Sequence, residues 1–197
     1  KLNMKKLFTM LSVVAISTTL SFAQQGSVAI GVGSNLADVS WQNYSLTPTV
    51  GYFIADNMMV GMGFAMGSES DTYDGFDNSG NSVTYDTKTS GMSLSPFFRY
   101  YMNDAFFGQA GIVMTSASNT DGDENVADNR TSTFGIQAAV GYSLMWNDKV
   151  CIEPYFGLET GNGSTEQSIG NITVSQDAPS TFEMGIGLSI HIRLGGE

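Results

Sequence analysis

Six ionisable side chains interrupt segments of this chain that are otherwise rich in glycine and apolar residues. A carboxylate or guanidinium that is removed from water must be paired with a group of opposite charge. These residues could therefore form a buried, mutually neutralising cluster, or they could line a path for ions. The six are Arg99, Glu153, Glu159, Glu183, His191 and Arg193.

Nothing in the sequence assembles a catalytic site. The chain has one histidine, His191, and Ser189 lies two residues before it. Two residues that are two positions apart in a strand share one face. There is no glycine-rich phosphate loop between a strand and a helix, and no Cys/His metal set. We therefore expect no enzymatic activity, no cofactor and no metal centre of that kind.

A second set of candidate ligands is acidic. Asp121, Asp123 and Asp128 lie in a short polar stretch that also holds Glu124 and Asn125. Hard oxygen ligands at close spacing are typical of calcium sites, but the stretch lacks the full loop pattern and its distal bidentate glutamate. The alternative interpretation is a solvated, mobile acidic loop.

Short polar turns organise the segments that must position these residues. Asp56-Asn57, Asn103-Asp104 and Asn147-Asp148 each join two runs of alternating apolar residues. Two strands joined by a two-residue turn form a hairpin. The turns recur after 47 and 44 residues, so each hairpin is followed by a much longer connection. Short turns on one side and long loops on the other are typical of an outer-membrane β-barrel.

Eight segments alternate with period two, the pattern of a β-strand. In the last segment Phe182, Ile186 and Ile190 share one face, while Gly187 and His191 share the other. A soluble sandwich or lipocalin would carry charges on its outer face, but the second face here is mostly small residues, which suit the narrow lumen of an eight-stranded barrel. Backbone amides in lipid have no water to bond, so the sheet must close. The segments are Gly26–Ser34, Tyr44–Ala55, Met58–Gly67, Thr87–Met102, Ala105–Ser118, Thr131–Trp146, Lys149–Gly161 and Thr181–Leu194.

The positions of the turns predict which ionisable residues meet. Arg99 lies four residues before one turn, Glu153 lies five residues after another, and His191 and Arg193 lie near the same end of the last strand. We predict that Glu153 pairs with Arg193 and Arg99 and plugs the lower lumen. A gated ion path through these residues is the alternative.

Aromatic residues gather beside the three turns, where an interfacial girdle of a membrane barrel is expected. Ordinary strand propensity for aromatic residues is the other explanation. The residues that we assign to the girdle are Tyr52, Phe53, Tyr100, Tyr101, Phe106, Phe107 and Trp146.

The first 23 residues have the pattern of a signal peptide. Lys5-Lys6 precede an apolar core over 7–20, and small residues stand at Ser21 and Ala23. The core is shorter than the ~20 residues that a retained membrane anchor would need. We predict a single domain over residues 24–197, with residues 1–3 extraneous. That domain carries five basic and 19 acidic side chains, a net charge of −14, which disfavours nucleic acid as a partner.

From these residues the chain resembles the eight-stranded outer-membrane β-barrel family of the OmpA/OmpX type. The resemblance rests on the three turns, on strands such as Val50-Gly51-Tyr52-Phe53, and on the alternating last strand. It implies an all-β, antiparallel, up-and-down transmembrane barrel with short periplasmic turns and long extracellular loops. It also implies contact with outer-membrane lipid, lipopolysaccharide and the barrel assembly machinery. Family members usually end on an aromatic residue, whereas this sequence continues past Leu194 to Gly195-Gly196-Glu197.

We expect an integral outer-membrane protein, exported by its signal peptide, that has a structural and surface-presenting role. Its acidic loops would bind a partner or an adhesion target. A narrow porin for small solutes or ions is the alternative, and a soluble periplasmic lipid carrier is a third interpretation. A lipid A-modifying enzyme is a remote alternative, because outer-membrane lipid A deacylases use a serine and a histidine on the lipid-facing wall, whereas Ser189 and His191 face the lumen in this register.

Overall fold

The computed structural model describes residues 25–34, 46–77, 79–102, 105–123, 125–147, 149–169 and 172–195. The predicted signal peptide, the turn at 103–104 and Asp148 lie outside these ranges. Within them, no helix is long and apolar enough to cross a membrane.

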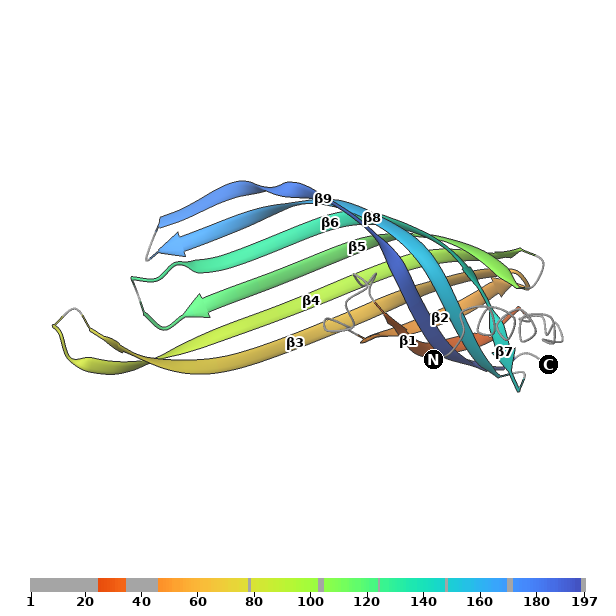
Figure 1. Cartoon of the computed structure of the whole chain (residues 1–197), viewed down its shortest axis with the longest axis horizontal. Helices are drawn as coiled ribbons and strands as arrows, with labels where there is room; N and C mark the ends of the chain where they lie inside the picture. Colours follow the sequence, from red (N-terminus) through yellow and green to blue (C-terminus); the bar gives the residue numbers. More distant parts are fainter. Residues whose placement is uncertain are drawn as a thin grey trace, which may run out of the picture.

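The described chain forms one antiparallel sheet that closes into a barrel (Figure 1). The ring closes where β1 pairs with β9 and where β6 pairs with β8. The short β7 follows β6 and pairs with β8 in the same register, so β6 and β7 together act as one strand and the barrel is eight-stranded. The predicted eight-stranded barrel is therefore confirmed. The elements are β1 Val28–Ser34, β2 Leu46–Ala55, β3 Met58–Phe76, β4 Ser82–Met102, β5 Phe106–Asp121, β6 Asp128–Tyr142, β7 Leu144–Trp146, β8 Val150–Ile169 and β9 Ile172–Leu194.

The break between β6 and β7 falls within a segment that the sequence predicted as one strand. Continuing the register of Gly141 with Tyr155 brings Tyr142 opposite Pro154, which has no N–H to give to a ladder. The amide of Ser143 donates to the carbonyl of Ala105 at 2.6 Å, which extends the β5–β6 ladder beyond Phe106 and Tyr142. The Ser143 side chain is buried in the lumen.

The short turns have the geometry that their residues favour. Asp56 and Asn57 alone separate β2 from β3, and the carbonyl of Asn57 accepts a bond from the amide of Tyr101 at 2.8 Å. Asn147 has a φ of 52°, in the left-handed region that asparagine tolerates and that hairpin turns often use. The predicted two-residue turn is confirmed at Asp56-Asn57, whereas Trp146 pairs with Val150, so the connection between β7 and β8 is one residue longer than predicted.

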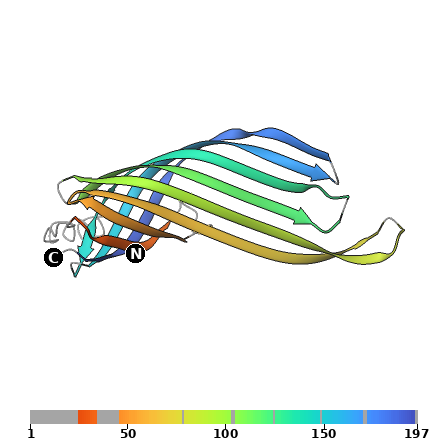
Figure 2. The same cartoon turned by 180° about the vertical axis from the view of Figure 1, so that it is seen from behind.

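The described parts of the predicted loops at 68–86, 119–130 and 162–180 are largely strands, so the strand ends were placed too early, while the predicted loop at 35–43 lies outside the described residues. The β3–β4 ladder runs to Phe76 opposite Ser82, and the β8–β9 ladder to Ile169 opposite Ile172. Aspartate, serine and glycine have low strand propensity, but cross-strand pairs hold these segments together. We call the described residues of 68–90, 119–130 and 162–180 the crown. The β3–β4 hairpin projects farthest, whereas β1 and β2 remain at the short-turn end (Figures 1 and 2).

The two faces of the wall are oriented as predicted. Large apolar side chains are exposed on the outside, as at Phe182 (63%) and Ile186 (64%). Several inward-facing residues are glycines, and aromatic side chains pack against them. A Cβ at Gly187 would lie 2.1 Å from the ring of Tyr155, whose hydroxyl donates to the carbonyl of Ser34 at 2.6 Å.

The predicted aromatic girdle is only half correct. Tyr52, Tyr100 and Phe106 are exposed on the outer wall, as is Trp146. Consecutive residues of a strand point to opposite faces, so the neighbour of each girdle residue must point inward. Inside the lumen, these neighbours form a buried core with an alanine and a methionine: Ala29, Phe53, Met59, Tyr101 and Phe107.

Candidate functional site in the barrel lumen

Glu153, on β8, is the centre of the buried polar network and is fully buried. One carboxylate oxygen, Oε2, forms an ion pair with Arg99 and accepts a bond from the hydroxyl of Ser189 at 3.2 Å. The other, Oε1, accepts from the hydroxyl of Tyr101 at 3.0 Å and from the Cys151 thiol at 3.3 Å. The carboxylate therefore has the paired surroundings that a buried charge requires.

Arg99 reaches this network from β4. Its Nε and Nη2 donate to Oε1 of Gln109 at 2.9 and 2.7 Å. Its guanidinium carbon lies 4.2 Å from the ring centroid of Phe107 and 5.3 Å from that of Phe97, within cation–π range. The guanidinium is enclosed by an amide, a carboxylate and two rings.

His191 enters from β9, where it lies opposite Cys151 in register. Its Nδ1 is 3.7 Å from Oε2 of Glu153, while its Nε2 is buried without a hydrogen-bond partner among the described residues. On the other side, a Cβ at Gly31 would lie 2.1 Å from the carbonyl oxygen of Ile190 and 2.5 Å from the Cβ of His191. The glycine therefore allows β1 to approach the backbone of β9 closely at His191.

Arg193 does not make the predicted direct ion pair. Ion pairs within 4.0 Å among the described residues join Glu153 to Arg99 and His191 only. Arg193 contacts the Cys151 sulfur at 3.8 Å, and its guanidinium carbon lies 5.0 Å from the ring centroid of Phe53. Both oxygens of Glu153 already have partners from other strands, so Arg193 packs one layer nearer the short turns.

Glu159 and Glu183 lie apart from this network. They are opposite each other on β8 and β9, six residues along β8 from Glu153. Both line a lumen cavity of about 270 Å³, together with Gln137 and His191. The six ionisable residues singled out in the sequence therefore separate into a buried network and a carboxylate pair farther from the short turns.

Sequence reasoning missed the three side chains that donate hydrogen bonds to Glu153 besides Arg99: Tyr101, Cys151 and Ser189. Each lies two residues from a predicted member on the same strand, namely Arg99, Glu153 and His191, respectively. Because side chains in a strand alternate with period two, extending each prediction by two residues would have found them.

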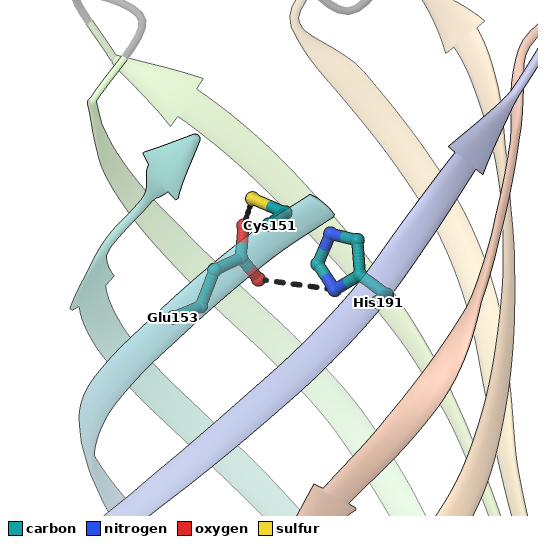
Figure 3. Close-up of side chains that lie close together, drawn as sticks. All are labelled: Cys151, Glu153 and His191. Carbon is teal, nitrogen blue, oxygen red and sulfur yellow. Dashed lines mark hydrogen bonds and ion pairs between the residues drawn. The ribbon is translucent and has the colours of Figure 1, made fainter. Parts of the chain in front are cut away.

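Cys151, Glu153 and His191 form the one group of three metal-ligand types in the described part of the chain whose ligand atoms all lie within 4.8 Å of one another (Figure 3). The guanidinium of Arg99 already neutralises Glu153, and that of Arg193 lies against the thiol. Two adjacent cations disfavour a third. The donor set therefore fits a hydrogen-bonded network better than a metal centre.

The carboxylates of the calcium candidate shape a turn. Oδ1 of Asp128 accepts from the amide of Asp121 at 2.8 Å, and Oδ1 of Asp121 accepts from the amide of Asp123 at 2.9 Å. The Tyr73 hydroxyl also donates to Oδ1 of Asp121, at 3.0 Å. Partial desolvation, this bond and the nearby charges of Asp121 and Asp123 raise the pKa of Tyr73 to about 12. Calcium binding here stays a prediction.

Among the described residues, Ser189 and His191 do not pair as a nucleophile and its base. Ser189 donates its hydrogen bond to Glu153 rather than to His191, and both side chains lie inside the barrel, away from its lipid-facing wall. What the arrangement does is fill one half of the lumen with rings and paired charges.

The comparison with protein families decides the assignment. A model of the autotransporter beta-domain matches residues 21–195. The chain belongs to the autotransporter beta-domain family. It is therefore an outer-membrane β-barrel.

Three solved structures are similar to this autotransporter beta-domain chain. The outer membrane protein OprG from Pseudomonas aeruginosa is 14% identical with a TM-score of 0.46, over 87% of this chain and 99% of that one. AlkL, solved in DMPC bilayers, is 12% identical with a TM-score of 0.41, over 89% and 91%. The beta domain of the Bordetella autotransporter BrkA is 10% identical with a TM-score of 0.39, over 88% and 99%. The comparison with curated proteins found no match.

Proposed function

We propose that this beta-domain is a structural, surface-presenting barrel that does not conduct ions. The observation that carries the proposal is the filling of the periplasmic half of the lumen. Phe53, Met59, Tyr101 and Phe107 are buried there, and the Glu153 network joins β4, β8 and β9 across the same space. An ion on this path would have to displace a paired, buried charge, which is energetically costly.

The crown is the surface that such a barrel presents. Its described residues carry ten carboxylates and two basic side chains. The rings of Tyr73 and Tyr85 lie opposite each other, with centroids 5.5 Å apart, and Thr84 donates to Asp74 at 2.8 Å. An acidic surface with tyrosines, held in paired strands, suits a cationic partner or adhesion target, which is the role that we propose for it.

A narrow porin is the second candidate function, and the lumen cavity favours it. The cavity of about 270 Å³ is lined by Glu159 and Glu183, so such a pore would select cations. The two functions differ in whether the Glu153 network opens.

Single-channel recording in planar bilayers separates them. We expect no defined current steps from the wild-type barrel, and no large stable pore from Glu153→Ala, because the aromatic core remains. Glu159→Gln is the matched control, since it removes a lumen carboxylate outside the network. Regular cation-selective steps that change in Glu159→Gln would establish the porin and contradict our proposal.

Export and insertion complete the proposal. The predicted signal peptide over 1–23 would direct export, and the barrel assembly machinery would insert the domain beside lipopolysaccharide. Heat-modifiable gel migration of outer-membrane fractions tests this, because a closed barrel migrates differently before and after boiling.

We also propose that the protein has no enzymatic activity. Unchanged lipid A mass spectra from cells with and without it would support this.

A further inference from the structure

Two basic residues meet on the outer wall at the base of the crown. Residues 24–197 contain five basic side chains. Arg99 and Arg193 lie in the lumen network, and Lys149 follows the periplasmic turn after β7. The remaining two, Lys88 and Arg130, line the same hollow of about 560 Å³. In a strongly acidic protein, this gathering requires an explanation.

Hydroxyl groups connect the two cations. By register Ser68 lies opposite Ser90, Ser90 opposite Ser118, and Ser118 opposite Arg130. The hydroxyls of Ser90 and Ser118 lie 2.9 Å apart. Lys88 is on the same face as Ser90, two residues nearer the tip of the crown. Phosphate oxygens are bound by such a combination of cations and hydroxyl donors.

The hollow lies at the edge of the lipid-facing surface. Its other side is lined by Met66 and Met92, which are 73% and 51% exposed. The outward-facing residues of β4 are apolar from Met102 to Met92, a distance of ten residues along the strand. At ~3.3 Å per residue and a strand tilt of ~40°, this segment spans about 25 Å along the membrane normal. This equals the height of the apolar band of a membrane barrel. The next outward residues, Ser90 and Lys88, therefore reach headgroup level.

Carboxylates approach the hollow from two sides. Glu166 lies opposite Arg130 on β8, and Asp86 lies two residues beyond Lys88 on β4. Neither forms an ion pair within 4.0 Å with a basic residue of the described chain. Lys88 therefore lies nearer the apolar band than Asp86, while Glu166 shares the register row of Arg130 without an ion pair to it.

We propose that Lys88, Arg130 and the serines between them bind the phosphate of an anionic lipid in the outer leaflet, whose acyl chains lie against Met66 and Met92. This inference rests on the membrane orientation used in the proposed function, and it adds a lipid partner. It does not depend on whether the barrel conducts.

The test is lipid retention measured by native mass spectrometry. Full-length folded barrel is titrated in detergent with bis-phosphorylated lipid A as the probe, and Lys88→Gln and Arg130→Gln are compared with Lys149→Gln. The control removes the same charge at the periplasmic end. We expect each of the two variants to bind lipid A about fivefold more weakly, the upper range for one exposed ion pair, and Lys149→Gln to match the wild type. Equal affinities in all three variants would overturn the site.

A second arm distinguishes the source of the phosphate. Inorganic phosphate at constant ionic strength should displace lipid A only at concentrations far above that of the lipid, because it cannot cover the methionines. Displacement by inorganic phosphate at a concentration equal to that of lipid A would overturn the lipid assignment. Heat-modifiable migration of every variant verifies folding, and bilayer recordings of Lys88→Gln should match the wild type whichever function holds for the lumen.

Discussion

The same hydrogen bond occurs at the two ends of this barrel in opposite surroundings. Tyr101 donates to Glu153 at 3.0 Å in the lumen, and Tyr73 donates to Asp121 at 3.0 Å in the crown. Tyr101 is 5% exposed, whereas Tyr73 is 39% exposed. A buried polar group that loses its partner cannot turn to water, while an exposed one can. Identical geometry therefore contributes differently to stability, and the following predictions test that difference.

The largest effect is expected from Glu153→Ala. It leaves the Arg99 guanidinium buried beside Gln109 with no carboxylate, which costs about 3–5 kcal/mol. Urea unfolding of the barrel in lipid vesicles, followed by tryptophan fluorescence, measures the change. Glu159→Ala, in the lumen cavity, is the control and should cost clearly less. A loss below about 1 kcal/mol for Glu153→Ala would show that the network contributes little.

Gly187→Val should be the next most damaging change. Because a Cβ at this position would overlap the Tyr155 ring, the ring must move, at about 1–3 kcal/mol for overpacking. Gly67→Ala at the edge of the crown is the control, since nothing lies within 4 Å of its Cβ position. Combining Gly187→Val with Tyr155→Ala should remove the steric part of the loss. If both glycine variants unfold alike, ring packing is not the cause.

Replacing each tyrosine by phenylalanine compares the two hydrogen bonds directly. Tyr101→Phe should lower the free energy of unfolding by about 1–2 kcal/mol, because it removes one donor from a buried carboxylate. Tyr73→Phe should leave the free energy of unfolding nearly unchanged, because water can replace the lost partner of an exposed group. Equal losses for the two variants in the same urea titration would contradict the assigned role of burial.

The smallest effect is a pH dependence confined to the crown. The folded chain holds the proton of Tyr73 more tightly than the unfolded chain, whose tyrosines titrate near ~10, since the pKa is raised to about 12. The contribution of this bond is therefore complete below pH ~10 and is lost as pH rises towards about 12. Tyrosinate absorbance of wild type minus Tyr73→Phe should titrate near the upper value. A midpoint near ~10 would exclude the bond to Asp121 in solution.

The sequence predicted the barrel because its strongest signals are local. The turn at Asp56-Asn57 and the alternation through Phe182, Ile186 and Ile190 depend on neighbouring residues only. The same alternation placed Glu153 and Arg99 inside at one level, and the ion pair follows from that placement.

Other features depend on contacts that no local pattern contains. The crown has the composition of loops, and only pairings such as Tyr73 with Tyr85 make it a sheet. Arg193 was predicted to reach Glu153, but Tyr101 and Ser189 bind the two carboxylate oxygens instead. These residues come from strands that are far apart in the sequence, so no local pattern shows which of them binds Glu153. The burial of Phe53 and Phe107 could have been predicted, because each is adjacent in its strand to a residue that faces outward and must therefore face inward itself.

The seam between β1 and β9 has a consequence for biogenesis. Val28 pairs with Leu194 and Gly33 with Ser189, so the two strands that seal the wall lie at opposite ends of the described chain. Until β9 emerges, β1 and β8 each expose a row of unsatisfied amides that could recruit another polypeptide. Before insertion into the membrane, the unpaired edges of β1 and β8 must therefore be covered by another protein or kept apart. Deletion of β9 should yield aggregates rather than a smaller barrel.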